Sequence, residues 1–251
     1  MVIGAKGQDG SILSQKLELM GHFVIRVSKE RAMFTSGSQL HDIKVPPLAD
    51  LTSCISFLDF LKPDVILHFA AVHSPTMVED GTAMESEMID CHIHITRNIV
   101  IWLEKNRDSK LLVALSSQMY SPDWVETRIN EKSPTSPSTF YGETKAKAFQ
   151  LIQEARTHSG INAAGVILFN HTSIYSKKDF LFPILAKSIS AQLSSKVMKI
   201  SIRNANAYLD IGSAEEYCEG ILKMAELDRL ADFVFSSNRP QQIISIVQET
   251  V

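Results

Sequence analysis

A tyrosine and a lysine four residues apart, Tyr141 and Lys145, form the pair in this sequence best suited to proton transfer. On a helix, residues with this spacing lie on one face, one turn apart. A lysine ammonium beside a phenol stabilises the phenolate and lowers the tyrosine pKa, so the tyrosine can exchange a proton near neutral pH. Many helices carry the YxxxK spacing by chance, and it indicates an oxidoreductase only where a nicotinamide site accompanies it.

A glycine-rich stretch near the N-terminus predicts such a site. Gly4, Gly7 and Gly10 follow the apolar segment 1–3, and apolar residues at helical spacing come next. Closely spaced glycines let the backbone turn sharply and approach a phosphate, which the N-terminal amides of the following helix can bind. With a second strand at 22–27, the series forms the context of a dinucleotide fingerprint. A glycine-rich turn without a ligand is the alternative.

The residues after this second strand bear on the choice of cofactor. Sites for NAD usually have an acidic residue here, which binds the ribose 2′-hydroxyl. This sequence has Ser28, Lys29, Glu30 and Arg31 instead. Two cations and a serine favour the 2′-phosphate of NADP, and Glu30 leaves NAD open. A solvated charged loop is the alternative.

The remaining patterns predict a doubly wound α/β fold. Apolar runs at 65–71 and 111–115 suit buried parallel strands, and ligands of such sheets bind beyond the carboxyl ends of the strands, where Ser116 and Ser117 lie. Ser138 is expected to cap the helix that carries Tyr141. Further predictions are helices at about 53–61, 85–106, 140–158 (ended by Gly160), 182–193 and 214–227, strands at 163–168, 199–202 and 233–236, and loop with a poorly marked strand at 32–48.

Composition narrows the class of protein. The chain has 251 residues, is 45% hydrophobic and 21% charged, and carries a net charge of −3, which gives no reason to expect nucleic acid or an anionic membrane as partner. Cys54, Cys91 and Cys218 are odd in number and lack metal-ligand spacing, so we expect reduced thiols in a cytoplasmic protein and no metal. We find no signal peptide and no apolar stretch long enough to cross a bilayer.

Six motifs in order resemble the extended short-chain dehydrogenase/reductase family of nucleotide-sugar enzymes, the NAD-dependent epimerases and dehydratases. The resemblance is greatest to the GDP-mannose 4,6-dehydratase branch, and it spans nearly the whole chain. The motifs are Gly4 to Leu13 (GAKGQDGSIL), Asp50-Leu51, Pro63 to Ala71 (PDVILHFAA), Ser133 to Lys145 (SPTSPSTFYGETK), Phe169 to His171 (FNH) and Asn204 to Tyr217 (NANAYLDIGSAEEY).

The resemblance implies a Rossmann-type domain over 1–168 and a small, shortened substrate-binding lobe over 169–251, interleaved with the last strands of the sheet. Tyr141 becomes the catalytic acid/base, Lys145 its partner at the cofactor ribose, and Ser116 the hydroxyl that orients the sugar. The residues expected to contact the cofactor are Gly4, Gly7, Gln8, Asp9, Gly10, Lys29, Arg31, Asp50, Leu51, Phe69, Ala70, Ala71, Tyr141 and Lys145. Those expected to contact the substrate are His73, Ser117, Gln118, Asn170 and Asn204.

The departures from the branch guide the functional prediction. Dehydratases have a carboxylate two residues after the catalytic Ser/Thr, and this sequence has Gln118, whose amide cannot serve as a general base. Leu209 replaces an arginine of the branch. The usual end of the substrate lobe is not found, which leaves open a reduced lobe, a lobe completed by a partner, or a fragment of a longer chain. We therefore predict an NADP-dependent reductase or epimerase of a nucleotide-linked 4-keto-6-deoxy sugar, with GDP as the preferred carrier.

Two alternatives stay open. One is a dehydratase in which Asp123, Glu126 or Glu143 replaces the missing carboxylate. The other is a nucleotide-binding homologue without turnover. Sequence alone does not decide the base, the sugar or the stereochemical outcome.

The family resemblance also implies a homodimer. The helices expected at 85–106 and 140–158 would pack with those of a second subunit, and the first carries Met88, Ile95, Ile99 and Trp102 at helical spacing. The stretch Cys91 to His94 fits no usual zinc pattern and is assigned a structural place in this interface.

Overall fold

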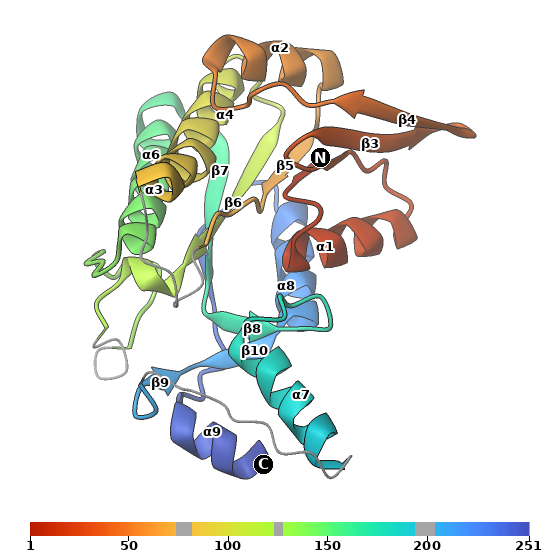
Figure 1. Cartoon of the computed structure of the whole chain (residues 1–251). Helices are drawn as coiled ribbons and strands as arrows, with labels where there is room; N and C mark the ends of the chain where they lie inside the picture. The colour runs from red at the N-terminus through yellow and green to blue at the C-terminus, as the bar shows by residue number, and fades with distance from the viewer. Residues whose placement is uncertain (74–81, 123–127, 194–203, 251) are drawn as a thin grey trace.

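The computed structural model describes residues 1–73, 82–122, 128–193 and 204–250 (Figure 1). Its centre is an eight-stranded sheet with the order β11-β7-β6-β5-β1-β2-β3-β4. The strands are β1 (Val2–Ile3), β2 (Arg26–Val27), β3 (Arg31–Ser36), β4 (Gln39–Lys44), β5 (Val65–His68), β6 (Lys110–Ser116), β7 (Asn162–Leu168) and β11 (Phe233–Phe235).

The fold class is confirmed as a Rossmann-type α/β fold, but the sheet is mixed. The six strands from β11 to β2 run parallel, whereas β3 pairs antiparallel with β2 and β4 pairs antiparallel with β3. The prediction of loop with one poorly marked strand for 32–48 is therefore wrong in part, because two strands, β3 and β4, occupy most of this segment. Gly37, at φ 61°, allows the tight turn between β3 and β4, and the resulting hairpin extends the sheet edge.

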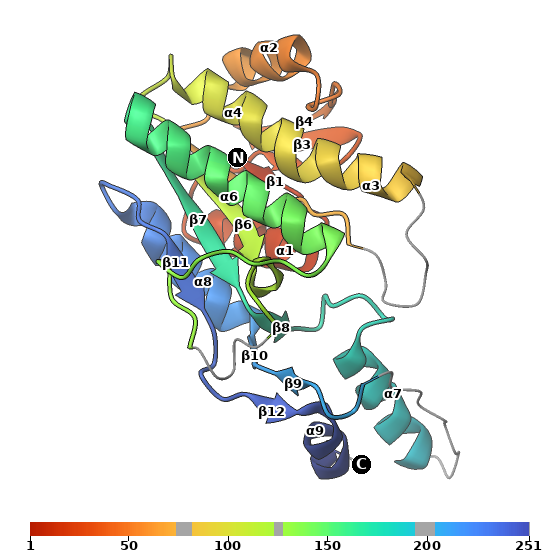
Figure 2. The same ribbon diagram turned by 90° about the vertical axis from the view of Figure 1, so that its left-hand side faces the viewer.

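Helices cover both faces of the sheet (Figures 1 and 2). α1 and α8 lie side by side on one face, while α4 and α6 lie together on the other with α2 beside α4. The predicted helix 85–106 is a continuous run of three pieces: α3, a π-helical segment and α4. The helices here are α1 (Gln8–Leu19), α2 (Leu51–Leu61), α3 (Thr82–Met88), the π-helix Ile89–His94, α4 (Ile95–Leu103), α6 (Phe140–Ser159) and α8 (Ala214–Glu226).

The strand pattern divides the core into two layers. Leu111 and Val113 of β6 join the cluster beneath α4 and α6, whereas Leu112 and Ala114 join the cluster beneath α1 and α8. Alternate residues of a strand point to opposite faces, so a strand covered on both sides is apolar throughout. This double burial explains why the run at 111–115 shows no polar alternation.

A smaller group of elements lies beyond the carboxyl ends of the parallel strands (Figure 1). It contains β8 (Asn170–Thr172) paired parallel with β10 (Ile211–Ser213), β9 (Tyr208–Leu209) paired antiparallel with β12 (Gln241–Gln242), α7 (Leu181–Leu193) and α9 (Ile243–Thr250). The strand predicted at 199–202 lies outside the described residues. The site predicted at the carboxyl edge therefore lies between the sheet and this group, which we call the lobe; its domain boundary at 168 stays a prediction.

Among the residues that the structure describes, no helix combines the length and apolar character needed to cross a membrane. Cys54, Cys91 and Cys218 are free thiols. Within the same described ranges, no group of His, Cys, Asp and Glu side chains is arranged to hold a metal ion.

Candidate active site

The helix that carries Tyr141 has well-defined ends. Thr139, rather than the predicted Ser138, caps its N-terminus, and its hydroxyl accepts a hydrogen bond from the Gly142 amide at 3.1 Å. Gly160 ends the helix in the left-handed conformation at φ 65°, as predicted. α6 packs on the sheet through residues such as Ile152, which is fully buried. Its first turn is thereby held at the carboxyl end of β6.

Lys145 is buried beneath Tyr141. Its Nζ lies 5.7 Å from the centre of the tyrosine ring and donates a hydrogen bond to the Ala114 carbonyl at 2.9 Å. Burial lowers the pKa of Lys145 to about 8, and the Cys91 thiol acts in the opposite direction. The backbone of β6 thus holds the ammonium in place, and its pKa lies close to physiological pH.

Ser116, at the end of β6, brings its hydroxyl to Tyr141. Burial raises the pKa of Tyr141, the hydrogen bond from Ser116 lowers it in part, and Cys91 and Asp9 raise it further. The sequence analysis predicted that Lys145 lowers the pKa of Tyr141, and this prediction is wrong. The ammonium of Lys145 lies over the ring, and desolvation of the phenolate is the largest effect on the tyrosine pKa. Ser116, Tyr141 and Lys145 nonetheless come together as the sequence predicted.

The glycine loop packs tightly against the end of β5. A Cβ added to Gly4, at φ 94°, would lie 2.4 Å from the Ala70 nitrogen, and one added to Gly10 would lie 2.2 Å from the Gly4 carbonyl oxygen. Gly7 is the N-cap of α1 and offers no side chain to its first amides. Uncapped amides at a helix N-terminus bind phosphate well, so the loop fits the pyrophosphate of a dinucleotide.

Gln8 and Asp9, expected at the cofactor, also join the glycine loop to the lobe. Asp9 Oδ1 lies 2.9 Å from His171 Nε2, and the Gln8 side-chain oxygen accepts hydrogen bonds from Ser173, at 3.1 Å, and from Ser176. Burial opposes a charge on His171, but the hydrogen bond and charge of Asp9 outweigh it and raise its pKa. The unusual GQDG motif therefore has a tertiary role in this chain.

The residues expected to select the cofactor already have protein partners. Lys29 Nζ lies 3.5 Å from Glu87 Oε1, and Arg31 pairs with Asp42 on the neighbouring strand. Both pairs are exposed, and solvent screens such pairs, so a phosphate could compete for either cation.

The residues expected at the adenine and along β5 take several positions. Asp50 caps α2 by accepting the Ser53 amide at 2.8 Å, and Leu51 is exposed. Phe69 is buried at the end of β5, whereas Ala70 and Ala71 are more accessible.

The predicted substrate residues divide into two groups. His73 lies near Tyr141, with ring centres 4.8 Å apart. Ser117 and Gln118 belong to the short 3-10 turn Ser117–Met119, where the Gln118 side-chain oxygen accepts from Thr139 at 3.3 Å. Asn170 in β8 and Asn204 are exposed on the lobe.

Sequence reasoning missed the contribution of the π-helical segment to this site. His92 is buried, 1% exposed, and its ring stands perpendicular to that of Tyr141, with centres 5.4 Å apart. The Cys91 carbonyl contacts His68 Nε2 at 3.0 Å. The sequence analysis gave the stretch Cys91 to His94 a structural place in a subunit interface, which stays a prediction; it did not place His92 against Tyr141 within the subunit.

The apolar stripe offered as a reason for dimerisation is mostly used within the subunit. Met88, Ile99 and Trp102 are at most 2% exposed. Trp102 also donates its indole N–H to Asp59 at 2.7 Å. These three side chains therefore do not support a homodimer, which stays a prediction.

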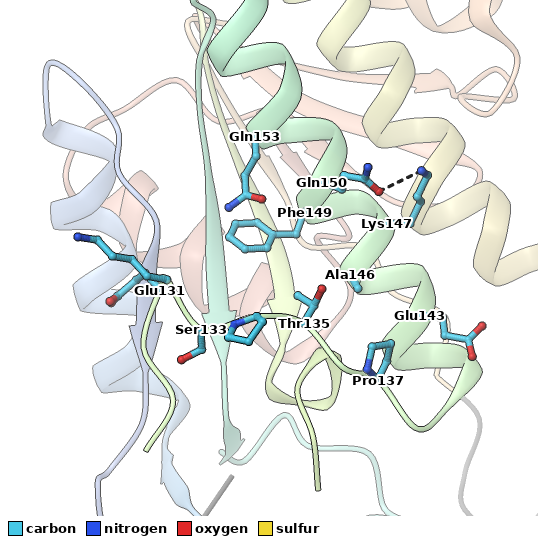
Figure 3. A pocket seen from close by; sticks show the side chains of 12 residues that line it. Glu131, Ser133, Thr135, Pro137, Glu143, Ala146, Lys147, Phe149, Gln150 and Gln153 are labelled. Atoms are coloured by element: carbon cyan, nitrogen blue, oxygen red, sulfur yellow. Dashed lines mark hydrogen bonds between the residues drawn. The ribbon is translucent and has the colours of Figure 1, made fainter. Parts of the chain in front are cut away.

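Glu143, one of the carboxylates considered as a replacement base, faces away from Tyr141. It lines a groove between residues 131–137 and the outer face of α6 (Figure 3). Two residues along a helix are about 200° apart, so Glu143 and Tyr141 lie on opposite sides. Asp123 and Glu126, the other two candidates, lie outside the described residues.

Comparison with known proteins identifies the class. The profile of the GDP-mannose 4,6 dehydratase family matches residues 1–251. Human GDP-mannose 4,6 dehydratase is 23% identical over 263 residues, covering 100% of this chain and 70% of the relative.

Solved structures agree with the fold. The dTDP-glucose 4,6-dehydratase of Bacillus anthracis str. Ames in complex with NAD superposes with a TM-score of 0.75 at 14% identity, covering 99% of this chain and 78% of that one. UDP-glucose 4-epimerase from Brucella ovis in complex with NAD gives a TM-score of 0.73 at 16% identity, covering 98% and 80%. The fold and the family match define a member of the NAD-dependent epimerase/dehydratase family, which belongs to the extended short-chain dehydrogenases/reductases. Within that class, this chain belongs to the GDP-mannose 4,6-dehydratase family.

Proposed function

We propose that the protein is a nucleotide-sugar reductase that acts on the C4 carbonyl of a GDP-linked 4-keto-6-deoxy sugar, with NADP as cofactor. The observation that carries this proposal is the Ser116–Tyr141–Lys145 group with an amide, Gln118, in place of the dehydratase carboxylate. The three residues suffice for reduction of a carbonyl, and the amide removes the base that water elimination requires.

Each residue has a definite task in the reduction. A bound nicotinamide would supply the hydride that C4 receives. Ser116 donates a hydrogen bond to the carbonyl oxygen and orients it, and Tyr141 transfers its phenolic proton to that oxygen as the alcohol forms. Lys145, held by the Ala114 carbonyl, stabilises the phenolate that remains. The raised pKa of Tyr141 suits a proton donor, since the phenol stays protonated at neutral pH.

NADP is proposed because Lys29 and Arg31 follow β2, where a 2′-phosphate would lie. NAD stays the alternative, since the two solved relatives named above contain NAD. The carrier GDP is proposed from the family, whose human member is named for GDP-mannose.

The primary test follows NADPH absorbance when the purified protein is mixed with GDP-4-keto-6-deoxymannose, with NADH run in parallel. We expect oxidation of NADPH, and loss of at least about 1000-fold in turnover for Tyr141→Phe, because the proton donor is removed. Turnover that survives this substitution would refute the mechanism.

A dehydratase is the second candidate, because the family and its human relative are named for that reaction. Incubation with GDP-mannose, followed by mass analysis of the sugar nucleotide, separates the two. Formation of a product lighter by one water would establish the dehydratase and exclude the role proposed for Gln118.

We also propose a cytoplasmic homodimer. Light scattering at micromolar concentration tests the assembly, and a single species at the mass of one chain would count against it.

A further inference from the structure

We propose that His92 is the positioning residue of the active site: as a neutral imidazole it joins the loop after β5 to the first turn of α6 and so holds Tyr141 in place. This inference deepens the proposed function. It depends on that function only for its kinetic readout.

The hydrogen bonds determine which nitrogen of His92 carries the proton. The Thr144 hydroxyl donates to the Tyr141 carbonyl at 2.8 Å, so its only proton is used. It must therefore accept from His92 Nδ1, which lies 2.8 Å away. On the other side, the Val72 amide donates to His92 Nε2 at 3.1 Å. Nδ1 is thus protonated and Nε2 is not.

These bonds link three segments that are distant in the sequence. Val72 follows the end of β5, His92 lies in the π-helical segment, and Thr144 is between Tyr141 and Lys145 on α6. The imidazole also packs edge-on against the Tyr141 ring at an interplanar angle of 86°. Both the backbone and the ring of Tyr141 are therefore restrained from one buried side chain. A π-helical segment adds a residue to the turn, and such segments are frequent at functional sites.

The surroundings of His92 keep it neutral. Burial lowers its pKa, and the positive charge of Lys145 on α6 lowers it further; His68, at the end of β5, and His73 act in the same direction. A second proton, on Nε2, would also face the N–H of Val72 and break that bond. The histidine therefore keeps its tautomer and its contacts near neutral pH.

Three variants test the role. His92→Phe keeps an aromatic ring and removes both hydrogen bonds, and His92→Asn keeps an amide that can donate to Thr144. His94→Phe is the matched control, because His94 lies two residues away at the surface, where it contacts Asp90 at 2.9 Å. With NADPH and GDP-4-keto-6-deoxymannose, His92→Phe should lower kcat about 10- to 100-fold with KM changed less than about threefold. His92→Asn should restore part of the loss, and His94→Phe should match the wild type.

A second readout does not require turnover. Long-range proton–nitrogen NMR of the wild type should show His92 with a single proton, on Nδ1, from pH 6 to pH 8. Line shapes of the carbon-labelled Tyr141 ring should show faster ring flipping in His92→Phe and no change in His94→Phe. A protonated Nε2, or an unchanged ring-flip rate, would overturn the inference.

The two proposals fail in different ways. A wild type that turns over none of the tested sugars, yet shows this tautomer and ring restraint, contradicts the proposed function and supports the role of His92. A wild type that turns over the sugar, together with a His92→Phe protein of equal kcat, supports the proposed function and contradicts the role of His92. Should His92→Phe fail to fold by circular dichroism, His92→Asn carries both readouts.

Discussion

Gly142, directly after Tyr141, has an environment that admits no side chain. A Cβ built there lies 2.2 Å from the Gln118 carbonyl oxygen and 3.1 Å from the Pro137 Cβ. The obstructing atom belongs to the backbone of the turn after Ser116, so a rotamer change cannot relieve the contact. Real Cβ contacts are essentially never shorter than 3.0 Å, so Gly142→Ala requires a displacement of about 0.8 Å between α6 and this turn.

This displacement acts on the two segments that hold Tyr141 and Ser116. A misplacement of roughly 1 Å at a reacting group costs about 100-fold in rate, equivalent to about 2.7 kcal/mol. Helix propensity alone predicts the opposite sign for stability, since alanine is favoured over glycine by up to about 1 kcal/mol. We expect the steric clash to outweigh the helix propensity of alanine. Gly142→Ala should therefore lose about 30- to 100-fold in kcat and unfold at a lower temperature than the wild type.

The assay is NADPH oxidation with GDP-4-keto-6-deoxymannose, with thermal unfolding followed by circular dichroism. Gly37→Ala is the control, because a Cβ at Gly37 meets nothing within 4 Å. Its positive φ should cost about 1 kcal/mol of stability without changing kcat. A Gly142→Ala protein with normal kcat and a raised unfolding temperature would refute the packing argument.

Three further predictions concern stability. Burial lowers the pKa of Lys145 to about 8, so its charge destabilises the folded state below that pH, and this destabilisation disappears as the pH rises towards the ordinary lysine pKa of 10.5. Lys145→Met carries no such charge. Its free energy of unfolding relative to the wild type, measured in urea, should therefore fall by about 3 kcal/mol between pH 7 and pH 10.5. The raised pKa of His171 adds stability below about pH 6.5 that is lost as pH rises through the folded value, so His171→Gln should cost more at pH 6 than at pH 8.5, and an equal cost would contradict the Asp9 pair. Ile152→Ala, at a position with no exposure, should lower the free energy of unfolding by about 2–5 kcal/mol, and a cost below about 1 kcal/mol would show that α6 is not packed as described.

Features that depend on local pattern could be predicted from the amino-acid sequence alone. The glycine spacing, the apolar runs of the buried strands and the YxxxK spacing each arise within a few residues, and the structure places Ser116, Tyr141 and Lys145 together as predicted. Cap positions were less accurate, because Ser138 and Thr139 are neighbouring hydroxyls and the backbone angles decide which one caps.

Contacts between segments that are distant in the sequence could not be predicted in this way, because they form only when the chain folds. Nothing local to His92 indicates that it lies against Tyr141, and nothing local to Asp9 indicates that it binds His171. The pKa of Tyr141 is a further property that local spacing did not predict. The spacing of Tyr141 and Lys145 suggested a lowered tyrosine pKa, whereas burial raises it. Desolvation depends on every atom packed around a group, and that environment exists only once the chain has folded.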